Sequence, residues 1–260
     1  MNDNILSPRE IRRYNKQIMI PEIGITGQEK LKNAKVLVVG AGGLGCPVLQ
    51  YLTAAGVGKT VIIEFDMVDE TNLQRQVLYG SDDVGKLKSI IAKNRLEQLN
   101  SLVETEIINL KLDSSNALNI INDFDIVVDA TDNLETRYII NDACVIANKP
   151  MVHGSIYKYE GAISVFNYKG GPTYRCYNPE KDNKENKNPH PADVGLLGVL
   201  PGITGIYMAN EVMKIITGSG HILSGKILLF NIFTNTFNIF NINNIPENHN
   251  ISEIHNSRDL

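Results

Sequence analysis

Residues 36–45 read VLVVGAGGLG, an apolar run that ends in a glycine-rich loop. Gly40, Gly42 and Gly45 fit the spacing G-x-G-x-x-G, and Gly43 lies within the same loop. Glycines between a buried strand and a helix let the backbone approach a phosphate, whose charge the helix N-terminus attracts. The stretch therefore predicts a Rossmann-like βα unit that binds a nucleotide, but the spacing alone does not choose between a dinucleotide and ATP.

The same alternation of strand and helix continues along the chain. Apolar runs predict the strands, and helical periodicity fills the intervals between them. We expect strands at 35–40, 60–66, 103–109, 126–130, 151–157 and 160–168, the last two joined by a turn around Glu160 and Gly161; helices at 8–20, 27–34, 43–58, 86–99, 113–122, 134–147 and 198–218; and a hairpin at 226–242 with a turn near Asn235. The predicted fold class is α/β, a Rossmann-like mixed but mostly parallel sheet flanked by helices, with N-terminal helices and a C-terminal β-hairpin.

The length of 260 residues suits one large domain. Residues 1–243 are predicted to form a single nucleotide-binding domain, and the polar residues 244–260 a frayed tail. Residues 170–193 are rich in Pro, Asn, Lys and Glu and have no apolar period, which predicts an exposed crossover loop.

Composition argues against several classes of protein. The net charge is -4 and the basic residues are scattered, so no nucleic-acid partner is expected. No stretch reaches the roughly 18 apolar residues of a membrane-spanning helix, and the N-terminus lacks a signal-peptide pattern. Three cysteines without a CxxC pair indicate a reducing compartment. These features predict a soluble, cytoplasmic protein with no membrane partner.

Side chains after the second strand favour a triphosphate over a nicotinamide. Glu64 lies about 20 residues beyond the glycine loop, where a carboxylate can accept hydrogen bonds from a ribose, and Asp66 is a further candidate there. Such a carboxylate is common to NAD sites and some ATP sites. Asp132 follows the strand at 126–130, on the ligand-binding edge, where a carboxylate could hold Mg²⁺. Amide and basic side chains gather between these positions, at Asn72, Gln74, Arg75, Lys86 and Lys88.

Seven short motifs together point to one family. They are RYNKQI at 13–18, GAGGLG at 40–45, AAGVG at 54–58, NLQRQ at 72–76, VGKLK at 84–88, DATDN at 129–133 and GVLPGITG at 198–205. Because it contains these seven motifs in this order, the chain resembles the ThiF/MoeB/HesA adenylyltransferases, which are related to ubiquitin-activating enzymes. The resemblance covers roughly residues 9–242.

The resemblance implies a reaction and its partners. In this family ATP reacts with the C-terminal glycine carboxylate of a small ubiquitin-fold sulfur-carrier protein to give an acyl adenylate and pyrophosphate. The carrier would be ThiS-like or MoaD-like, and the pathway thiamine thiazole or molybdopterin synthesis. The family also implies a homodimer, in which the N-terminal helix of one subunit serves the neighbouring site.

The resemblance also assigns roles to individual residues. Glu64 would hold the ribose, Asp132 the Mg²⁺, and Gln76 and Arg137 would shape the cleft. Lys16 stands where the family has an arginine that reaches the triphosphate from the partner subunit. Lysine keeps the charge but loses the bidentate fork, so weaker clamping of the phosphates is expected. The predicted phosphate-binding residues are Asn72, Arg75 and Lys88, above the loop from Gly40 to Gly45.

Two departures from the family pattern concern zinc and sulfur. Family members commonly hold a structural zinc on two CxxC pairs, but here Thr173 takes the first cysteine position of TYRC and the C-terminal tail has no cysteine. Cys176 alone cannot bind a tetrahedral zinc, so no zinc site is predicted. Pro191 stands where ThiF-type members place a crossover-loop cysteine, which favours a separate sulfurtransferase or persulfide donor.

Other interpretations stay open from sequence alone. A nicotinamide-dependent oxidoreductase would use the same glycine loop, and a decayed family member would bind nucleotide or carrier without turnover. Asp132 could cap the helix at 134–147 instead of holding a metal. The remaining candidates are predicted to be structural or unengaged: Cys46 and Cys144 in the core, His153 packed, His190 exposed.

Overall fold

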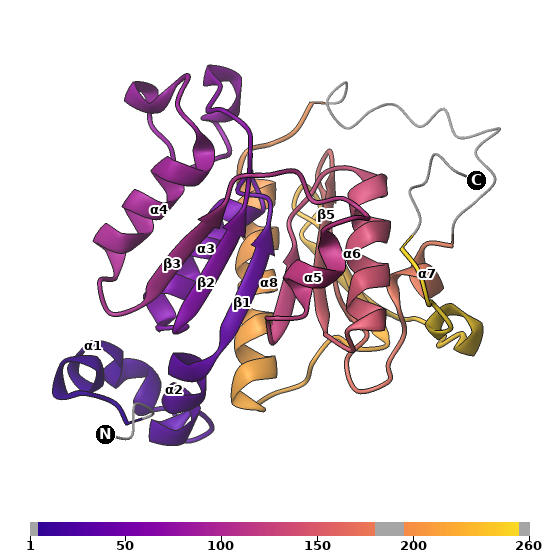
Figure 1. Cartoon of the computed structure of the whole chain (residues 1–260), viewed down its shortest axis with the longest axis horizontal. Helices are drawn as coiled ribbons and strands as arrows, with labels where there is room; N and C mark the ends of the chain where they lie inside the picture. The colour runs from indigo at the N-terminus through magenta and orange to yellow at the C-terminus, as the bar shows by residue number, and fades with distance from the viewer. Residues whose placement is uncertain (1–4, 180–194, 255–260) are drawn as a thin grey trace.

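The computed structural model describes residues 5–179 and 195–254. In these ranges an eight-stranded sheet runs through the protein in the order β3-β2-β1-β4-β5-β6-β7-β8 (Figure 1). The parallel strands are β1 (Lys35–Val39), β2 (Lys59–Ile63), β3 (Glu104–Ile108), β4 (Ile126–Asp129) and β5 (Met151–Tyr157). The sheet continues antiparallel through β6 (Glu160–Phe166), β7 (Lys226–Asn231) and β8 (Thr236–Asn241). The predicted mixed, mostly parallel sheet is confirmed.

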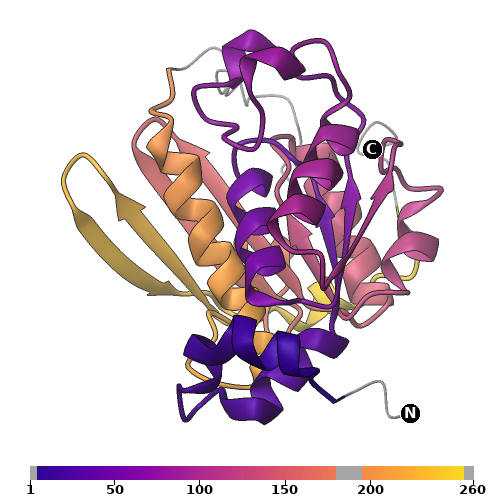
Figure 2. The same ribbon diagram turned by 90° about the vertical axis from the view of Figure 1, so that its left-hand side faces the viewer.

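Helices cover both faces of the parallel part. On one face lie α3 (Gly45–Ala55), α4 (Lys88–Leu99) and α8 (Val199–Thr217), which Figure 2 shows side by side. On the other face lie α5 (Ala117–Ile121) and α6 (Leu134–Ile146), with α7 (Tyr174–Tyr177) beyond α6. Because the crossovers place helices on both faces, the central strands are buried on both sides and read as continuous apolar runs.

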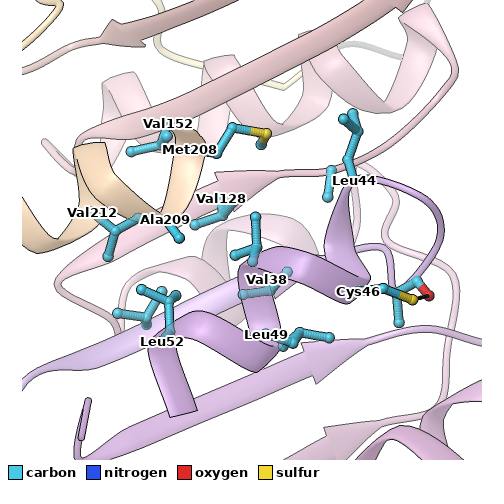
Figure 3. Packing of buried hydrophobic residues seen from close by; sticks show 14 of the residues in the cluster. Val38, Leu44, Cys46, Leu49, Leu52, Val128, Val152, Met208, Ala209 and Val212 are labelled. Carbon is cyan, nitrogen blue, oxygen red and sulfur yellow. Dashed lines mark hydrogen bonds between the residues drawn. The ribbon is translucent and has the colours of Figure 1, made fainter. Parts of the chain in front are cut away.

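Alternate residues of one strand serve two separate cores. Val38 of β1 contributes to the cluster under α3 and α8, whereas Leu37 contributes to the cluster under α5 and α6. Figure 3 shows the first cluster, in which Val38 and Val128 of the sheet lie close to Leu49 of α3 and Met208 of α8. Cys46 lies in this cluster and Cys144 in the other, so both are core residues as predicted.

Two short helices precede the sheet, α1 (Pro8–Ile18) and α2 (Gly24–Asn33). A capping box starts α1, in which Ser7 and Glu10 satisfy each other's backbone N–H groups. Tyr14 of α1 accepts a hydrogen bond from Asn100, just after α4, and lies against Gly56, just after α3. Both helices therefore lie at the end of the sheet where the parallel strands begin.

The remaining differences from the predicted elements are local. The turn between β5 and β6 falls on residues 158–159, not around Glu160, because Glu160 pairs with Tyr157. Part of the predicted loop 170–193 forms α7, and the predicted tail contains a 3-10 helix, Pro246–His249, that contacts Cys176. Residues 180–193, including His190 and Pro191, lie outside the described residues.

Within residues 5–179 and 195–254 no helix combines the length and the hydrophobicity needed to cross a bilayer.

Candidate functional site

A cavity of about 330 Å³ lies at the carboxyl ends of β1, β2, β4 and β5. Strand β1 has β2 on one side and β4 on the other, so the strand order reverses here. Open α/β sheets bind ligands at such switch points, since the loops on either side diverge and leave a crevice. The cavity lies beside the glycine loop, where the sequence predicted the nucleotide.

Most of the predicted site residues meet in this cavity. Those that line it are Gly40, Gly42, Gly43, Glu64, Asp66, Arg75, Gln76, Lys88, Asp132 and Arg137. Gly45, Asn72 and Lys16 do not line it. Gly45 begins α3 directly behind the loop, Asn72 supports Gln76, and Lys16 lies on α1 at the opposite end of the sheet. The prediction gave Lys16 to the site of a partner subunit, which a single chain does not test.

Side chains of neighbouring elements fix the backbone of the glycine loop by hydrogen bonds to Ala41. Glu64 accepts hydrogen bonds from the backbone N–H groups of Ala41 (2.9 Å), Phe65 (2.8 Å) and Asp66 (2.9 Å). The carbonyl of Ala41 in turn accepts hydrogen bonds from the hydroxyl of Tyr79 (2.8 Å) and the thiol of Cys46 (3.3 Å). Burial raises the pKa of the Cys46 thiol to about 12, so it keeps the proton that it donates. Glu64 thus braces the loop in addition to the ribose contact predicted for it.

Two loop glycines should respond oppositely to alanine. A Cβ on Gly45 would lie 2.0 Å from the carbonyl oxygen of Gly40, so Gly45→Ala must displace the loop. We expect its thermal unfolding midpoint to fall by about 5–10 °C. A Cβ on Gly42 would meet only Gln76, at 3.5 Å, so Gly42→Ala should keep its unfolding midpoint but bind ATP more weakly.

Differential scanning fluorimetry and ATP titration of both variants would check this contrast. Equal stability of the Gly45→Ala variant and the wild-type protein would show that the loop does not need the close approach at Gly45.

The polar side chains on the β2 side differ in burial. Gln76 is buried, and its amide donates to Asn72 over 2.9 Å. Arg75 is half-buried, with its guanidinium donating to the carbonyl of Thr71 at 3.1 Å. Lys88 is only 5% exposed, and its Nζ lies 3.4 Å from the carboxylate of Asp66. The β2 side of the cavity therefore presents one buried cation, Lys88, and one half-buried cation, Arg75.

Asp132 is free for a ligand. The residue that caps α6 is Asn133, whose side chain accepts a hydrogen bond from the N–H of Thr136 at 2.9 Å. The alternative that Asp132 caps this helix is therefore wrong. In the described part of the chain the Asp132 carboxylate, which is exposed and lines the cavity, makes no hydrogen bond of its own.

A buried acid that the sequence did not single out supports this turn. Asp129, at the end of β4, accepts hydrogen bonds from Thr131 through one oxygen and lies 2.7 Å from Nδ1 of His153 through the other. Arg137 lies 3.7 Å from Asp129 and donates to the carbonyl of Thr131 over 2.9 Å. This network fixes the turn that carries Asp132.

The ionisation of the buried pair follows from its surroundings. Burial lowers the pKa of His153, more than the nearby carboxylate raises it. Burial alone would raise the pKa of Asp129, but the hydrogen bond from His153 and the charge of Arg137 outweigh it and lower that pKa. Neutral His153 therefore donates its Nδ1–H to an ionised Asp129. His153 is packed as predicted, but its bond to Asp129 was missed because pairing across strands is set by register.

The cavity favours anions with several charges. Five basic side chains of the described residues line it: Arg75, Lys88, Lys111, Arg137 and Lys158. Lys111 and Lys158 were missed because neither lies in a recognisable motif; one follows β3 and the other lies in the β5–β6 turn. A polyphosphate suits such a set of cations, and preorganised cations also stabilise charge that develops during phosphate chemistry.

The region where the family binds zinc has other contacts here. The Cys176 thiol lies 3.4 Å from the hydroxyl of Thr173 and accepts a hydrogen bond from the N–H of Ile245 at 3.4 Å. Among residues 5–179 and 195–254 no group of three or more His, Cys, Asp or Glu side chains is arranged to hold a metal. The absence of zinc stays a prediction.

Curated proteins of similar sequence cover most of the chain. A sulfur carrier protein adenylyltransferase of Thermus thermophilus is 46% identical over 91% of this chain and 89% of its own length. A probable molybdopterin-synthase adenylyltransferase of Porphyra purpurea is 44% identical over 91% of this chain and 62% of its own. The adenylyltransferase and sulfurtransferase MOCS3 of Aedes aegypti is 47% identical over 90% of this chain, which spans only 53% of that protein.

Solved structures of similar fold include E. coli MccB. Its structure with ATP is 25% identical, with a TM-score of 0.77, over 90% of this chain and 74% of that one. Its structure with MccA-N7isoASN has a TM-score of 0.80 over 90% of this chain and 72% of that one. The sequence profile of the ThiF family matches residues 14–251. With its glycine loop, its basic cavity at the switch point and this match over nearly its whole length, the chain belongs to the ThiF family.

Proposed function

We propose that the protein is an ATP-dependent adenylyltransferase that activates the C-terminal glycine carboxylate of a ubiquitin-fold sulfur-carrier protein. The observation that supports this most is the cavity itself, in which a braced glycine loop faces basic side chains and one free carboxylate, Asp132. The names of the Thermus and Porphyra relatives support the same reaction type.

The proposed reaction needs positioning and charge neutralisation more than acid–base chemistry. An oxygen of the carrier carboxylate forms a bond to the α-phosphorus of ATP, and the bond from that phosphorus to the bridging oxygen breaks, so pyrophosphate leaves with the electron pair. Arg75 and Lys88 would neutralise the phosphate charge and orient the chain of phosphates. No proton has to move, because the attacking carboxylate is already ionised.

Asp132 suits a magnesium ion. Its exposed carboxylate lines the cavity without being used by the helix cap, and oxygen ligands of this kind are those that Mg²⁺ prefers. Bound Mg²⁺ would neutralise part of the phosphate charge. The other two acids that line the cavity are less available, because Asp66 lies beside Lys88 and Glu64 accepts three backbone hydrogen bonds.

A second cavity suggests where the carrier tail would lie. This cavity, of about 390 Å³ and here called the hairpin groove, runs along β5, β6, β7 and β8. It shares Ile156 and Tyr157 with the cavity beside the glycine loop, which is called the nucleotide cavity below. The β7–β8 hairpin projects from the molecule (Figure 2), and the exposed side chains of Leu229 on β7 and Phe240 on β8 line the groove. An apolar surface that leads into the site suits an extended peptide tail with a carboxylate at its end.

Several finer points belong to the same proposal. Homodimer formation and a role in thiamine or molybdopterin synthesis are proposed from the resemblance, and a cytoplasmic location from the cysteine content and the N-terminal sequence. Sulfur transfer by a separate sulfurtransferase is supported by the relative MOCS3, whose name carries both activities and of which this chain spans about half. No nucleic-acid partner is proposed.

Carrier-dependent exchange of pyrophosphate into ATP tests the proposal. We expect the wild-type protein to exchange label with a ThiS-like or a MoaD-like carrier and to require Mg²⁺ and the carrier's terminal glycine. A carrier truncated by that glycine is the matched control.

The rival functions give other results. Tight binding of NADH with no exchange would favour a nicotinamide oxidoreductase, which would leave Asp132 and most of the basic side chains without a ligand. ATP binding with no exchange by any carrier would favour a decayed enzyme. Either result contradicts the proposal.

A further inference from the structure

A basic residue outside every family motif lies where the two cavities meet. Lys158 lines the nucleotide cavity, and its neighbours Ile156 and Tyr157 line both that cavity and the hairpin groove. A ligand that extends from one cavity into the other must therefore pass the tip of the β5–β6 turn. Lys158 is the charged side chain at that tip, and it is exposed.

The turn holds Lys158 in an unusual backbone conformation. Tyr157 pairs with Glu160, so Lys158 is the first residue of a two-residue connection, and its φ is 53°. A side chain other than glycine rarely takes this left-handed region, because the Cβ crowds the backbone. Left-handed non-glycine residues persist where the surrounding structure imposes them, and they are common at ligand-binding sites. The conformation fixes the direction in which the lysine leaves the turn.

The ammonium group is available to an anion. Its Nζ lies 5.4 Å from the centre of the Tyr157 ring, within the range of a cation–π contact. In residues 5–179 and 195–254 no carboxylate lies within ion-pair distance of Lys158. By contrast, Lys88 already faces Asp66, and Arg137 is held by Thr131 and Asp129.

Charge along the hairpin groove indicates which anion reaches Lys158. Of the described residues that line the groove, Glu160 is acidic and none is lysine or arginine. A peptide tail with a terminal carboxylate is therefore not retained along the groove by charge, and the first cation that it meets is Lys158. The basic residues proposed for the phosphates, Arg75 and Lys88, lie on the β2 side of the cavity.

We propose that Lys158 binds the terminal carboxylate of the acyl substrate and holds it beside the triphosphate before the acyl adenylate forms. This assignment rests on the proposed function. Lys158 stays protonated throughout, while the carboxylate oxygen bonds to the α-phosphorus and pyrophosphate leaves. Because the carboxylate loses its charge as the bond forms, Lys158 stabilises the bound substrate more than the transition state. Its loss should therefore raise the KM for the carrier more than it lowers kcat.

The test compares Lys158→Asn and Lys158→Arg in pyrophosphate exchange, with the full chain and whichever purified carrier supports exchange by the wild-type protein. Asparagine tolerates the left-handed backbone and removes the charge, whereas arginine keeps the charge. We expect Lys158→Asn to raise the KM for the carrier by about tenfold and to leave the KM for ATP unchanged. Lys158→Arg should restore most of the lost affinity.

Lys169 offers a matched control. It has φ 51° and lies 5.1 Å from the ring centre of Tyr168, yet it lines neither cavity. Lys169→Asn should therefore leave both KM values unchanged.

Each other result overturns the assignment in a recognisable way. An increase in the KM for ATP would place Lys158 on the triphosphate instead, and unchanged KM values would remove it from binding altogether. If none of the carriers supported pyrophosphate exchange by the wild-type protein, the proposed function itself would be wrong, and so would the role assigned to Lys158.

Discussion

Asp132→Asn is expected to lower carrier-dependent adenylation by about 10³-fold. Its carboxylate lines the cavity, and Asn133 supplies the helix cap in its place. Asparagine has the same shape but lacks the negative charge that would hold Mg²⁺ against the phosphates. The substitution should therefore remove activity without disturbing the turn below, which Asp129 and Arg137 fix independently.

Pyrophosphate exchange over a range of Mg²⁺ concentrations measures this effect, alongside the thermal unfolding midpoint. Asp123→Asn is a suitable control, because Asp123 precedes β4 at the opposite end of the sheet and is exposed. Retention of more than about a tenth of the wild-type rate at saturating Mg²⁺ would exclude Asp132 as the main ligand of the metal.

Lys88→Met is expected to reduce adenylation by about 10²- to 10³-fold with no loss of stability. Lys88 is only 5% exposed, and its partner Asp66 is itself largely in water, so the ion pair compensates poorly for burying the charge. A methionine of similar length removes this unfavourable burial. A buried lysine that lowers the stability of the fold and faces a cavity with other basic side chains is best explained by an anion that binds there.

The unfolding midpoint and the exchange rate of the same preparation check both halves of this prediction. Lys86→Met is the control, since Lys86 is 56% exposed and lies 3.9 Å from Asp83, outside the cavity. A clear fall in the midpoint of Lys88→Met would mean that the lysine serves the fold, and undiminished exchange would remove it from the phosphate site.

Local patterns account for most of what the sequence predicted correctly. The run from Val36 to Gly45 produced β1, the glycine loop and the start of α3, because a strand buried on both faces needs continuous apolar residues. Gly56 and Gly218 end α3 and α8 with φ 88° and 75°, as glycine after a helix predicts. These features depend on residues close together in the chain, so short windows contain the information.

Contacts between distant segments were decided only by the tertiary structure. The bond between Asp129 and His153 depends on β4 and β5 pairing in one register. The position of Lys158 depends on the β5–β6 turn, which lies at residues 158–159 and not around Glu160 as the sequence predicted. The sequence could not decide which residue caps α6, because Asp132 and Asn133 are both good capping types. Only the backbone geometry selects Asn133.

The sequence by itself thus determined the α/β alternation, the glycine-rich loop after β1 and the chemical types of side chain available to the cavity. The tertiary structure alone decided which of these side chains share a cavity, which are occupied by the protein's own groups, and which stay free for a ligand. The physical reason is that propensity and periodicity act over a few residues, whereas the order and register of the strands set distances between residues tens of positions apart.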